Sequence, residues 1–461
     1  MKRIGILTAG GDTPALNATL HGAITRANEM RIEVYGLMRG FGSLMNEAVP
    51  HVHLNPLFQP IPELEPTRGG TIIGSSRTYV DPKRKDQIDA VGNRLQQLGL
   101  DGLICIGGDG TMNGLQPLAQ FIPTVLAPKT IDNDLGLNYA EEVENWDREV
   151  TGDGGFRYIQ RPDSGAFDIE QMINYCTPGY ATAVFEAAHG IQRVRTTAES
   201  HRRIVIVEVM GRHSGYIALG AAYGQPDIVL VPEAGVNLDR LAARVMEIYD
   251  AQKNVVIVCG EGVVDENGND LGSEHSSTDP AGNAVLTGAA EALKHLLLER
   301  IGEEYFNKVR RGARPGSAVF TRKVGHTQRG GRPVRFDRHH ASGLGGQAVD
   351  MLVDGRSGAV SLLQWNRAQG FYLDSCPGSA FIDRWGHIHP RKMHRSFYDS
   401  ELMKPSATGI EYLLPIFTSA VGADDVEHIR QTVFDSGNLT QPYHSVNTDI
   451  DRRIRYLNES R

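Results

Sequence analysis

Short apolar runs rich in Val and Ile recur along the chain, and each ends in Gly, Pro or a polar residue. Runs of this length and composition are typical of parallel strands that are buried on both faces. Residues 85–99 and 238–252 instead repeat apolar positions with the period of an amphipathic helix. The alternation predicts an α/β fold with doubly wound parallel sheets. The predicted strands are residues 3–9, 101–108, 123–129, 203–211, 227–233 and 254–262.

Two segments interrupt this alternation and predict additions to the core. Residues 137–178 are polar and rich in Gly and acidic residues, which fits either a surface loop or a lid that shapes a binding pocket. Residues 376–461 form a tail with a basic, helix-like last part at 449–461, and we expect it to pack on the core or to serve assembly. Its histidines predict no metal site, because supporting ligands are missing; they are His387, His389 and His394.

Composition and charge narrow the class of protein. The length of 461 residues favours two or three domains, with the apolar and charged shares of a globular enzyme. The net charge is −8, from 47 Lys and Arg against 55 Asp and Glu, so we expect no nucleic-acid partner. The chain lacks a long apolar run and a signal-peptide pattern, which predicts a cytoplasmic protein without a membrane segment. The four cysteines are far apart, and we interpret them as buried thiols, with Cys105 and Cys259 in strand-like runs.

Glycine-rich turns follow two of the predicted strands. IGGDGTMNG at 106–114 and TAGGDTPALN at 8–17 both place paired glycines at a strand exit. Such glycines serve either a tight turn with positive φ or a backbone cradle for phosphate at a helix N-terminus. Neither stretch continues as a P-loop, so each motif alone leaves both interpretations open.

Charged side chains gather at the other predicted strand exits. APKTIDND at 127–134 places two aspartates two residues apart, which fits a surface turn or a proton-accepting carboxylate beside a metal-binding one. RGGTIIGSSR at 68–77, EVMGRHSGY at 208–216 and GHTQRGGRPVRFDR at 325–338 add arginines beside glycines. Several arginines in this setting favour the binding of phosphate esters.

These motifs, taken together and in this order, closely resemble the phosphofructokinase family. The resemblance covers about residues 2–136 and 179–375. It implies two Rossmann-like domains with an inserted loop region and a C-terminal extension. It also implies Mg²⁺-dependent transfer of the terminal phosphoryl group of ATP to the 1-hydroxyl of fructose 6-phosphate, giving fructose 1,6-bisphosphate. The implied parts are a nucleotide-binding domain at 1–136 plus about 329–375, the insertion 137–178, a sugar-phosphate-binding domain at 179–328 and the extension 376–461.

The resemblance also implies a role for individual residues. Asp132 matches the family's base, which accepts the proton of the attacking hydroxyl. Thr130 and Arg212 match groups that neutralise the transferring phosphoryl, and Lys129 is a further candidate cation. The implied donor site comprises Gly11, Phe41, Arg77, Thr78, Gly108, Asp109, Gly110, Thr111 and Gly114, with Asp109 and Asp134 at Mg²⁺. The implied sugar-phosphate site comprises Thr130, Asp132, Arg203, Met210, Gly211, Arg212, Glu261, His326 and Arg329. Arg203 matches an arginine that crosses a subunit interface, which implies a homodimer or homotetramer.

Two positions give opposite indications about the phosphoryl donor. Family members with Gly at position 110 tend to use ATP, because an aspartate there would crowd and repel its α-phosphate. Pyrophosphate users carry Lys at position 129, and this chain has Lys129. We expect ATP, since the steric and charge argument at Gly110 is the more direct one, and pyrophosphate is the alternative donor.

Other departures concern the acceptor and regulation. Phe320 stands where the family usually has an arginine for the 6-phosphate, although Arg322 is nearby. Fructose 6-phosphate is therefore the expected acceptor, with another sugar phosphate such as sedoheptulose 7-phosphate as the alternative. The effector-site positions hold His21, Thr25 and Arg195, so we expect weak control by ADP or phosphoenolpyruvate. A catalytically silent subunit is a further alternative, disfavoured because Asp109, Thr130, Asp132 and Arg212 are all present.

Overall fold

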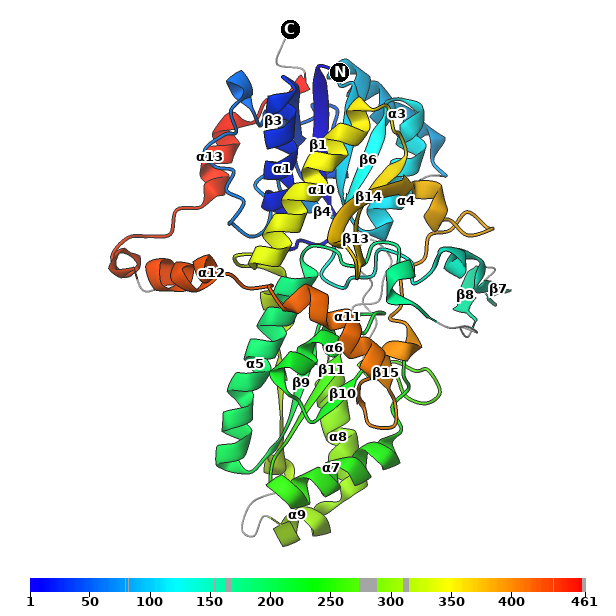
Figure 1. The fold of residues 1–461 in the computed structure, drawn as a ribbon, viewed down its shortest axis with the longest axis vertical. Helices are drawn as coiled ribbons and strands as arrows, with labels where there is room; N and C mark the ends of the chain where they lie inside the picture. Colours follow the sequence, from blue (N-terminus) through cyan, green and yellow to red (C-terminus); the bar gives the residue numbers. More distant parts are fainter. Residues whose placement is uncertain are drawn as a thin grey trace.

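The computed structural model describes residues 1–78, 80–81, 83–152, 155–161, 167–272, 288–309, 315–433 and 435–457. They form two lobes stacked along the long axis of the molecule, each with a sheet between helices (Figure 1). The α/β fold with a parallel core, predicted from the alternating apolar runs, is confirmed. In these ranges, no helix has both the length and the apolar character that a membrane crossing requires.

The larger sheet is built around three of the predicted strands, at 3–9, 101–108 and 123–129. Its strand order is β14-β13-β6-β5-β1-β2-β3, with β4 beside the end of β1. The central pairs are parallel and their strands are almost wholly buried, because helices cover both faces. The strands are β1 (Arg3–Ala9), β2 (Glu33–Leu37), β3 (His51–His53), β4 (Ser75–Ser76), β5 (Gly102–Gly107), β6 (Thr124–Pro128), β13 (Ala359–Asn366) and β14 (Gly370–Pro377).

Both edges of this sheet are antiparallel, which the prediction of parallel sheets did not anticipate. β3 pairs antiparallel with β2, and β14 pairs antiparallel with β13. For β14 the connection explains the difference, since residues 367–369 are too few for the helical crossover that a parallel pair needs. The other strands of this sheet were missed in the sequence; they are β2, β3, β4, β13 and β14.

Helices from distant parts of the chain cover the larger sheet. α1 (Leu16–Glu29) and α10 (Arg335–Val353) pack on one face, and α3 (Lys85–Gln97) and α4 (Asp109–Leu115) on the other. α1 and α10 approach closely, because a Cβ at Gly22 would lie only 2.0 Å from the carbonyl oxygen of Ser342. The short helix α2 (Phe41–Met45) follows β2.

The smaller sheet has the order β10-β11-β9-β12, and all its neighbouring strands are parallel. Helices α5 and α6 cover one face, and α7, α8 and α9 cover the other. The predicted helix at 238–252 is confirmed as α7, whereas β10 is shorter than the predicted strand 227–233 and β12 was missed. The strands are β9 (Ile204–Val209), β10 (Ile228–Leu230), β11 (Val255–Gly260) and β12 (Val319–Lys323). The helices are α5 (Tyr180–His201), α6 (Tyr216–Gly220), α7 (Leu238–Gln252), α8 (Ala289–Ile301) and α9 (Glu303–Val309).

The polar segment 137–178 contains a hairpin and a buried return. β7 (Trp146–Val150) and β8 (Phe156–Gln160) pair antiparallel and project from the junction of the two lobes (Figure 1). Beyond the hairpin, Tyr175 and Cys176 are completely buried in the core of the smaller lobe. The segment is therefore anchored at its return rather than being a surface loop throughout.

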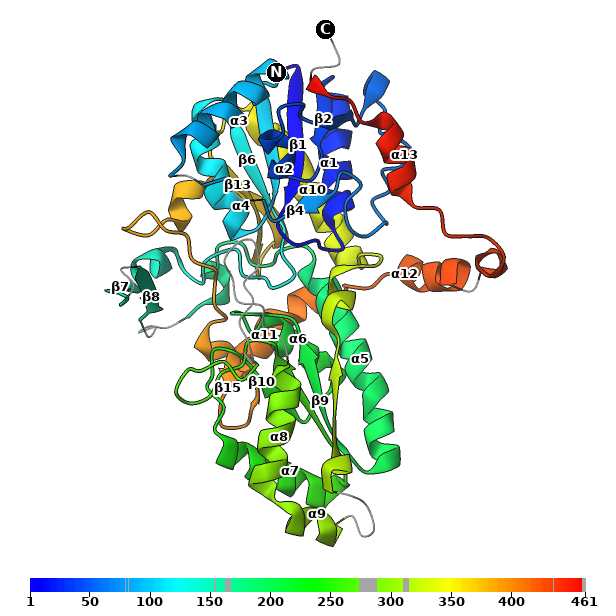
Figure 2. The same ribbon diagram turned by 180° about the vertical axis from the view of Figure 1, so that it is seen from behind.

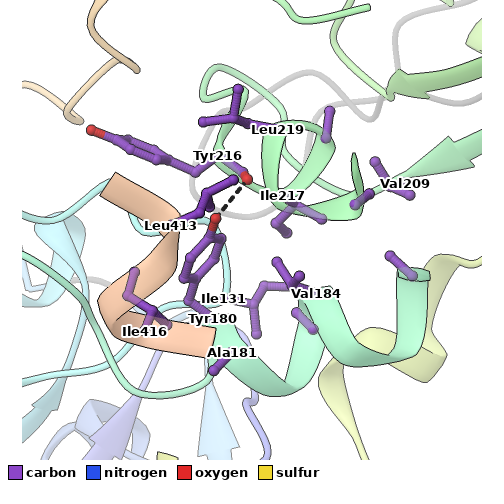
Figure 3. Close-up of a cluster of buried hydrophobic side chains, with 14 of the residues drawn as sticks. Ile131, Tyr180, Ala181, Val184, Val209, Tyr216, Ile217, Leu219, Leu413 and Ile416 are labelled. Carbon is purple, nitrogen blue, oxygen red and sulfur yellow. Dashed lines mark hydrogen bonds between the residues drawn. The ribbon is translucent and has the colours of Figure 1, made fainter. Parts of the chain in front are cut away.

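The tail packs on both lobes. Figure 3 shows Leu413 and Ile416 of α11 (Ala407–Phe417) facing Tyr180 of α5, whose hydroxyl donates to the carbonyl of Tyr216. α12 (Ala423–His428) projects from the body in both views, although its Asp424 and Asp425 pair with Arg338 of α10 (Figures 1 and 2). α13 (Val446–Arg453) lies beside the edge of the larger sheet. The helix-like pattern at 449–461 was only partly right, because α13 ends at Arg453. A small hairpin joins β15 (Tyr398–Asp399) to β16 (Lys404–Pro405).

Candidate active site

The carboxyl ends of β1, β5 and β6 meet those of β9 and β11 at a cavity between the lobes. This is the edge at which open α/β sheets bind ligands. The cavity has a volume of about 460 Å³, and most of the residues singled out in the sequence line it. From the predicted sites these are Gly11, Phe41, Arg77, Thr78, Gly108, Asp109, Gly110, Thr111, Lys129, Thr130, Asp132, Asp134, Met210, Arg212, Glu261, His326 and Arg329.

The glycine-rich turn after β5 is explained by space rather than by positive φ. Gly108 is extended, with φ −97° and ψ −159°, and α4 begins at the next residue. A Cβ at Gly107 would collide with Thr111 at 2.0 Å, whereas a Cβ at Gly110 would meet no atom within 4 Å. The protein itself therefore does not require glycine at position 110, and the space there opens on the cavity. In the matching turn after β1, Gly10 does adopt a positive φ of 82°.

Four carboxyl groups line this cavity: those of Asp109, Asp132, Asp134 and Glu261. Burial raises the pKa of Asp109 and of Asp132, and the nearby charge of Asp134 raises both further. The Oδ1 atom of Asp132 is buried and accepts no hydrogen bond in the described part of the chain. A buried carboxyl oxygen without a hydrogen-bond donor is costly, which indicates a place for a ligand atom.

The segment Lys129–Asp134, here called the acidic loop, carries most of these groups. The Thr130 hydroxyl accepts a hydrogen bond from the amide of Asp132 at 3.0 Å, and the Ser214 hydroxyl donates to the Asp132 carbonyl at 3.2 Å. Lys129 is 5% exposed and its ammonium donates to the Gly11 carbonyl, while burial lowers the pKa of Lys129 to about 7. The acidic loop is thus tied to both lobes.

The opposite end of the cavity is built from β9, β11, β12 and the turn that follows β12. Gln328 accepts from the amide of Met210 at 2.9 Å and donates to the Ala183 carbonyl at 3.1 Å, which holds this turn against β9. The Arg329 guanidinium reaches the Asp12 carbonyl at 3.3 Å, so it lies between the two ends of the cavity. Basic side chains in the cavity lining balance the charge of its carboxyl groups. These basic residues are Arg77, Lys129, Arg212, Lys323 and Arg329.

Three residues of the predicted sites lie outside the cavity lining. Gly114 is behind Phe41, and a Cβ at Gly114 would lie 3.4 Å from the Phe41 ring. Gly211 adopts a positive φ of 117°, a backbone conformation that favours glycine. Arg203 directly precedes β9, at the end of the strand opposite to the cavity. Its role across a subunit interface therefore stays a prediction.

Some cavity residues were missed in the sequence. His213 lies inside the motif at 208–216, and Lys323 lies two residues before the motif at 325–338, so their positions beside these motifs could have marked them as candidates. Pro390 belongs to the tail, and no pattern in the sequence marks it as a cavity residue. The remaining missed residues are Ala9, Gly10, Thr13 and Gly325, which are neighbours of predicted ones.

The tail histidines and the predicted effector positions have structural partners. His389 stacks on Trp146, with ring centroids 3.8 Å apart, and bonds to Asp383 at 2.8 Å. His394 bonds to Ser396.

Among the predicted effector positions, Arg195 pairs with Asp227 at 3.2 Å. The expectation of weak effector control stays a prediction.

Comparison with known proteins decides the family. The family model described as phosphofructokinase matches residues 3–139 and 165–352. The chain belongs to the phosphofructokinase family. It is therefore a phosphotransferase, as the resemblance of its motifs implied, and not an unrelated α/β protein with a similar cavity.

The relatives of this phosphofructokinase are named for two different phosphoryl donors. A Streptomyces coelicolor protein named ATP-dependent 6-phosphofructokinase 3 is 34% identical over 78% of this chain and 91% of its own length. Another from the same organism, named pyrophosphate–fructose 6-phosphate 1-phosphotransferase, is 33% identical over 78% of this chain and 90% of its own. The solved pyrophosphate-dependent phosphofructokinase of Marinobacter aquaeolei shares the fold, with a TM-score of 0.67 and 18% identity over 92% of each chain. Overall similarity therefore leaves the donor open.

Proposed function

We propose that this protein transfers the terminal phosphoryl group of ATP to the 1-hydroxyl of fructose 6-phosphate. The hydroxyl oxygen bonds to the terminal phosphorus as the bond from that phosphorus to its bridging oxygen breaks, and ADP leaves. Asp132 accepts the hydroxyl proton at its unpartnered buried Oδ1. Its buried setting supports this role, because a raised pKa makes the carboxylate a stronger base. Arg212 and Thr130 neutralise and position the transferring group.

The space beside Gly110 is the observation that carries the choice of ATP. A nucleotide donor needs room for its α-phosphate beyond the two phosphates that it shares with pyrophosphate. No protein atom lies within 4 Å of the Cβ position of Gly110, which lines the cavity at the start of α4. An aspartate there would place a carboxylate in this space and repel the α-phosphate.

Lys129 supports pyrophosphate as the second candidate donor. Its ammonium lies in the cavity beside Gly11, where it could neutralise the end of a small, highly charged donor. Burial lowers the pKa of Lys129 to about 7, so its charge depends on the ligand that binds beside it. We rank ATP first because Lys129 neutralises the terminal phosphates of either donor, whereas the space at Gly110 is useful only to the nucleotide.

Lys323 is our candidate for the missing cation at the sugar phosphate. Phe320 packs on the hydrophobic core of the smaller lobe, so it cannot replace the family's arginine. Arg322 does not line the cavity, whereas Lys323 does, beside His326 and Glu261. Lys323 also pairs with Glu208 at 2.8 Å and would share its charge between that carboxylate and the phosphate. The acceptor is thus fructose 6-phosphate, or another sugar phosphate of similar charge.

The carboxyl groups at the donor site fit Mg²⁺. Among the described residues, no three His, Cys, Asp or Glu side chains are grouped so that they could hold a metal alone. Mg²⁺ typically takes one or two carboxylates together with substrate phosphates, and the neighbouring Asp109 and Asp134 supply them. When bound, Mg²⁺ would neutralise charge on the donor phosphates.

The division of labour between the lobes follows from this assignment. We propose that residues 1–136 with about 329–375 bind the nucleotide and that 179–328 bind the sugar phosphate, while 137–178 and 376–461 complete the site. We also propose a homodimer or homotetramer, in which Arg203 of one subunit reaches the acceptor of another.

A coupled assay tests the proposed function directly. The purified protein would be supplied with fructose 6-phosphate and Mg²⁺, once with ATP and once with pyrophosphate. Turnover with ATP alone supports the proposal. Turnover with pyrophosphate alone overturns the choice of donor, and no turnover with either, while sedoheptulose 7-phosphate is phosphorylated, overturns the choice of acceptor.

A further inference from the structure

Arg391, in the tail, is a buried cation that contacts the acidic loop. Its side chain is 2% exposed. Nε and Nη2 donate to the Asn133 carbonyl at 3.2 and 2.7 Å, and Nη1 donates to the carbonyls of Asn174 at 2.7 Å and Ile173 at 3.4 Å. In the described part of the chain, this guanidinium donates only to main-chain carbonyls. It therefore joins the acidic loop, the return of the 137–178 segment and the tail.

The contacted residue, Asn133, separates the two aspartates of the acidic loop. It adopts a left-handed φ of 56°, which turns the backbone between Asp132 and Asp134. The amide of Arg391 also donates to the Asp134 carbonyl at 2.6 Å. The main chain and the side chain of Arg391 therefore hold the carbonyls of Asn133 and Asp134, and with them the directions in which both aspartates leave the backbone.

The side chain of Asn133 is held as well, and again by the tail. Its Nδ2 donates to the Tyr412 hydroxyl of α11 at 2.6 Å, and its Oδ1 accepts from the Thr177 amide at 2.8 Å. The Tyr216 ring lies under the guanidinium, 5.1 Å from the Arg391 Cζ. Packing alone does not explain a buried arginine at position 391. Burying its charge is costly, and an apolar side chain of similar volume would fill the core at least as well.

We propose that Arg391 is a positioning residue for the reaction, and that the tail thereby forms part of the active site. Arg391 lies outside residues 3–139 and 165–352, the ranges that match the family model. Its effect would pass through Asn133 to Asp132, so the inference rests on the proposed role of Asp132 as the base. A base displaced by about 1 Å loses on the order of 10²-fold in rate, which sets the size of the expected effect.

The test compares Arg391→Ala and Arg391→Lys with the wild type. Arg384→Ala is the matched control, since Arg384 belongs to the same tail but is exposed and stacks on Trp385. We expect Arg391→Ala to lower kcat by about 10²-fold with little change in KM for either substrate, and Arg384→Ala to leave both unchanged. Millimolar guanidinium should restore part of the kcat of Arg391→Ala, whereas equal NaCl or urea should not. Arg391→Lys should stay impaired, because one ammonium cannot reproduce the fork of the guanidinium.

Hydrogen exchange separates this inference from the proposed function. Amides 133–136 and 173–177 should exchange faster in Arg391→Ala than in the wild type, whatever substrates the enzyme accepts. If Arg391→Ala proves insoluble, Tyr412→Phe, which removes the Asn133 contact, should show the same faster exchange near 133 with a smaller loss of kcat. Unchanged kcat per folded molecule, or a loss that guanidinium does not relieve, would overturn the inference. A wild type that is inactive with fructose 6-phosphate would instead refute the proposed function and leave the exchange result standing.

Discussion

The two ends of the cavity are built on opposite principles. One end, here called the glycine end, comprises Gly11, Gly108 and Gly110 at the exits of β1 and β5. The other, here called the cation end, comprises Arg212, Lys323 and Arg329 with His326. The glycine end offers backbone groups and, at Gly110, space that no protein atom fills within 4 Å of the Cβ position. The cation end offers charged side chains, and its Arg329 reaches as far as Gly11. The choice of phosphoryl donor should therefore depend on the missing side chain at Gly110. The choice of acceptor should depend on the charged side chains of the cation end.

Asp132 lies where both ends meet, so its replacement should have the largest effect. Asp132→Asn keeps the size of the side chain but removes the proton acceptor. We expect kcat to fall by about 10²–10⁴-fold, the usual contribution of a general base. KM for both substrates should change little, because the amide leaves either end of the cavity intact. If Asp132→Asn retained most of its kcat, Asp132 would not be the base. The reacting groups would then not lie where the glycine end and the cation end meet.

Gly110→Asp tests whether open space selects the donor. A carboxylate near the α-phosphate should lower kcat/KM for ATP by roughly 10- to 100-fold, which corresponds to about 1.4–2.7 kcal/mol of repulsion. Kinetics with fructose 6-phosphate at saturating donor should stay close to those of the wild type. Gly110→Ala is the matched control, because its Cβ meets no atom within 4 Å and brings no charge. If Gly110→Ala lowered kcat/KM for ATP as much as Gly110→Asp, the size of the side chain at position 110, and not its charge, would exclude ATP.

The glycine end was largely predictable from sequence, and the reason is that it is local. A short apolar run followed at once by GGDG encodes both the strand and the turn, so β5 and its exit follow from neighbouring residues. The same holds for β1 and β6. The chain need not bring distant parts together for these groups to be recognised.

Other parts of the site depend on packing between distant segments, and sequence patterns did not reveal them. Pro390 reaches the cavity, and Arg391 the acidic loop behind it, only because the tail runs back between the lobes, where α11 packs on the core. Lys323 was overlooked in favour of Arg322, since the direction of a side chain on β12 depends on how that strand packs. The antiparallel edge strands β3 and β14 were missed as well, because pairing at a sheet edge depends on where the packed chain returns to the sheet.

Asp337 links the two lobes, and its replacement should affect stability rather than catalysis. Its Oδ2 accepts from the amide of Thr182 at 2.7 Å and from the Thr182 hydroxyl at 2.5 Å, which ties α10 to α5. Burial raises the pKa of Asp337 from 3.8 to about 6. A raised carboxyl pKa gives stability that is complete below about pH 4 and is lost as the pH rises to about 6.

Asp337→Asn lacks this titration, so its stability relative to the wild type should rise across the same pH range. The gain should approach about 3 kcal/mol in the free energy of unfolding between pH 4 and pH 7. Denaturant titrations of both proteins at several pH values measure it. Both ends of the cavity should keep their KM values. A difference that stayed constant with pH would show that Asp337 does not carry this proton in the folded protein.

Lys323→Met tests whether the presence of a cation selects the acceptor, and its effect should be the smallest. Removing one charged hydrogen bond of about 1.5 kcal/mol should raise KM for fructose 6-phosphate roughly tenfold and leave KM for ATP unchanged. Arg322→Met is the matched control on the same strand, since Arg322 does not line the cavity and should leave both values near those of the wild type. The buried Glu208 would lose its partner in Lys323→Met, so Lys323→Arg is needed as well. If Lys323→Arg preserves KM while Lys323→Met raises it, the charge at position 323 serves the phosphate. A larger effect of Arg322→Met would move the cation end to the other face of β12, where a neighbouring subunit would have to complete it.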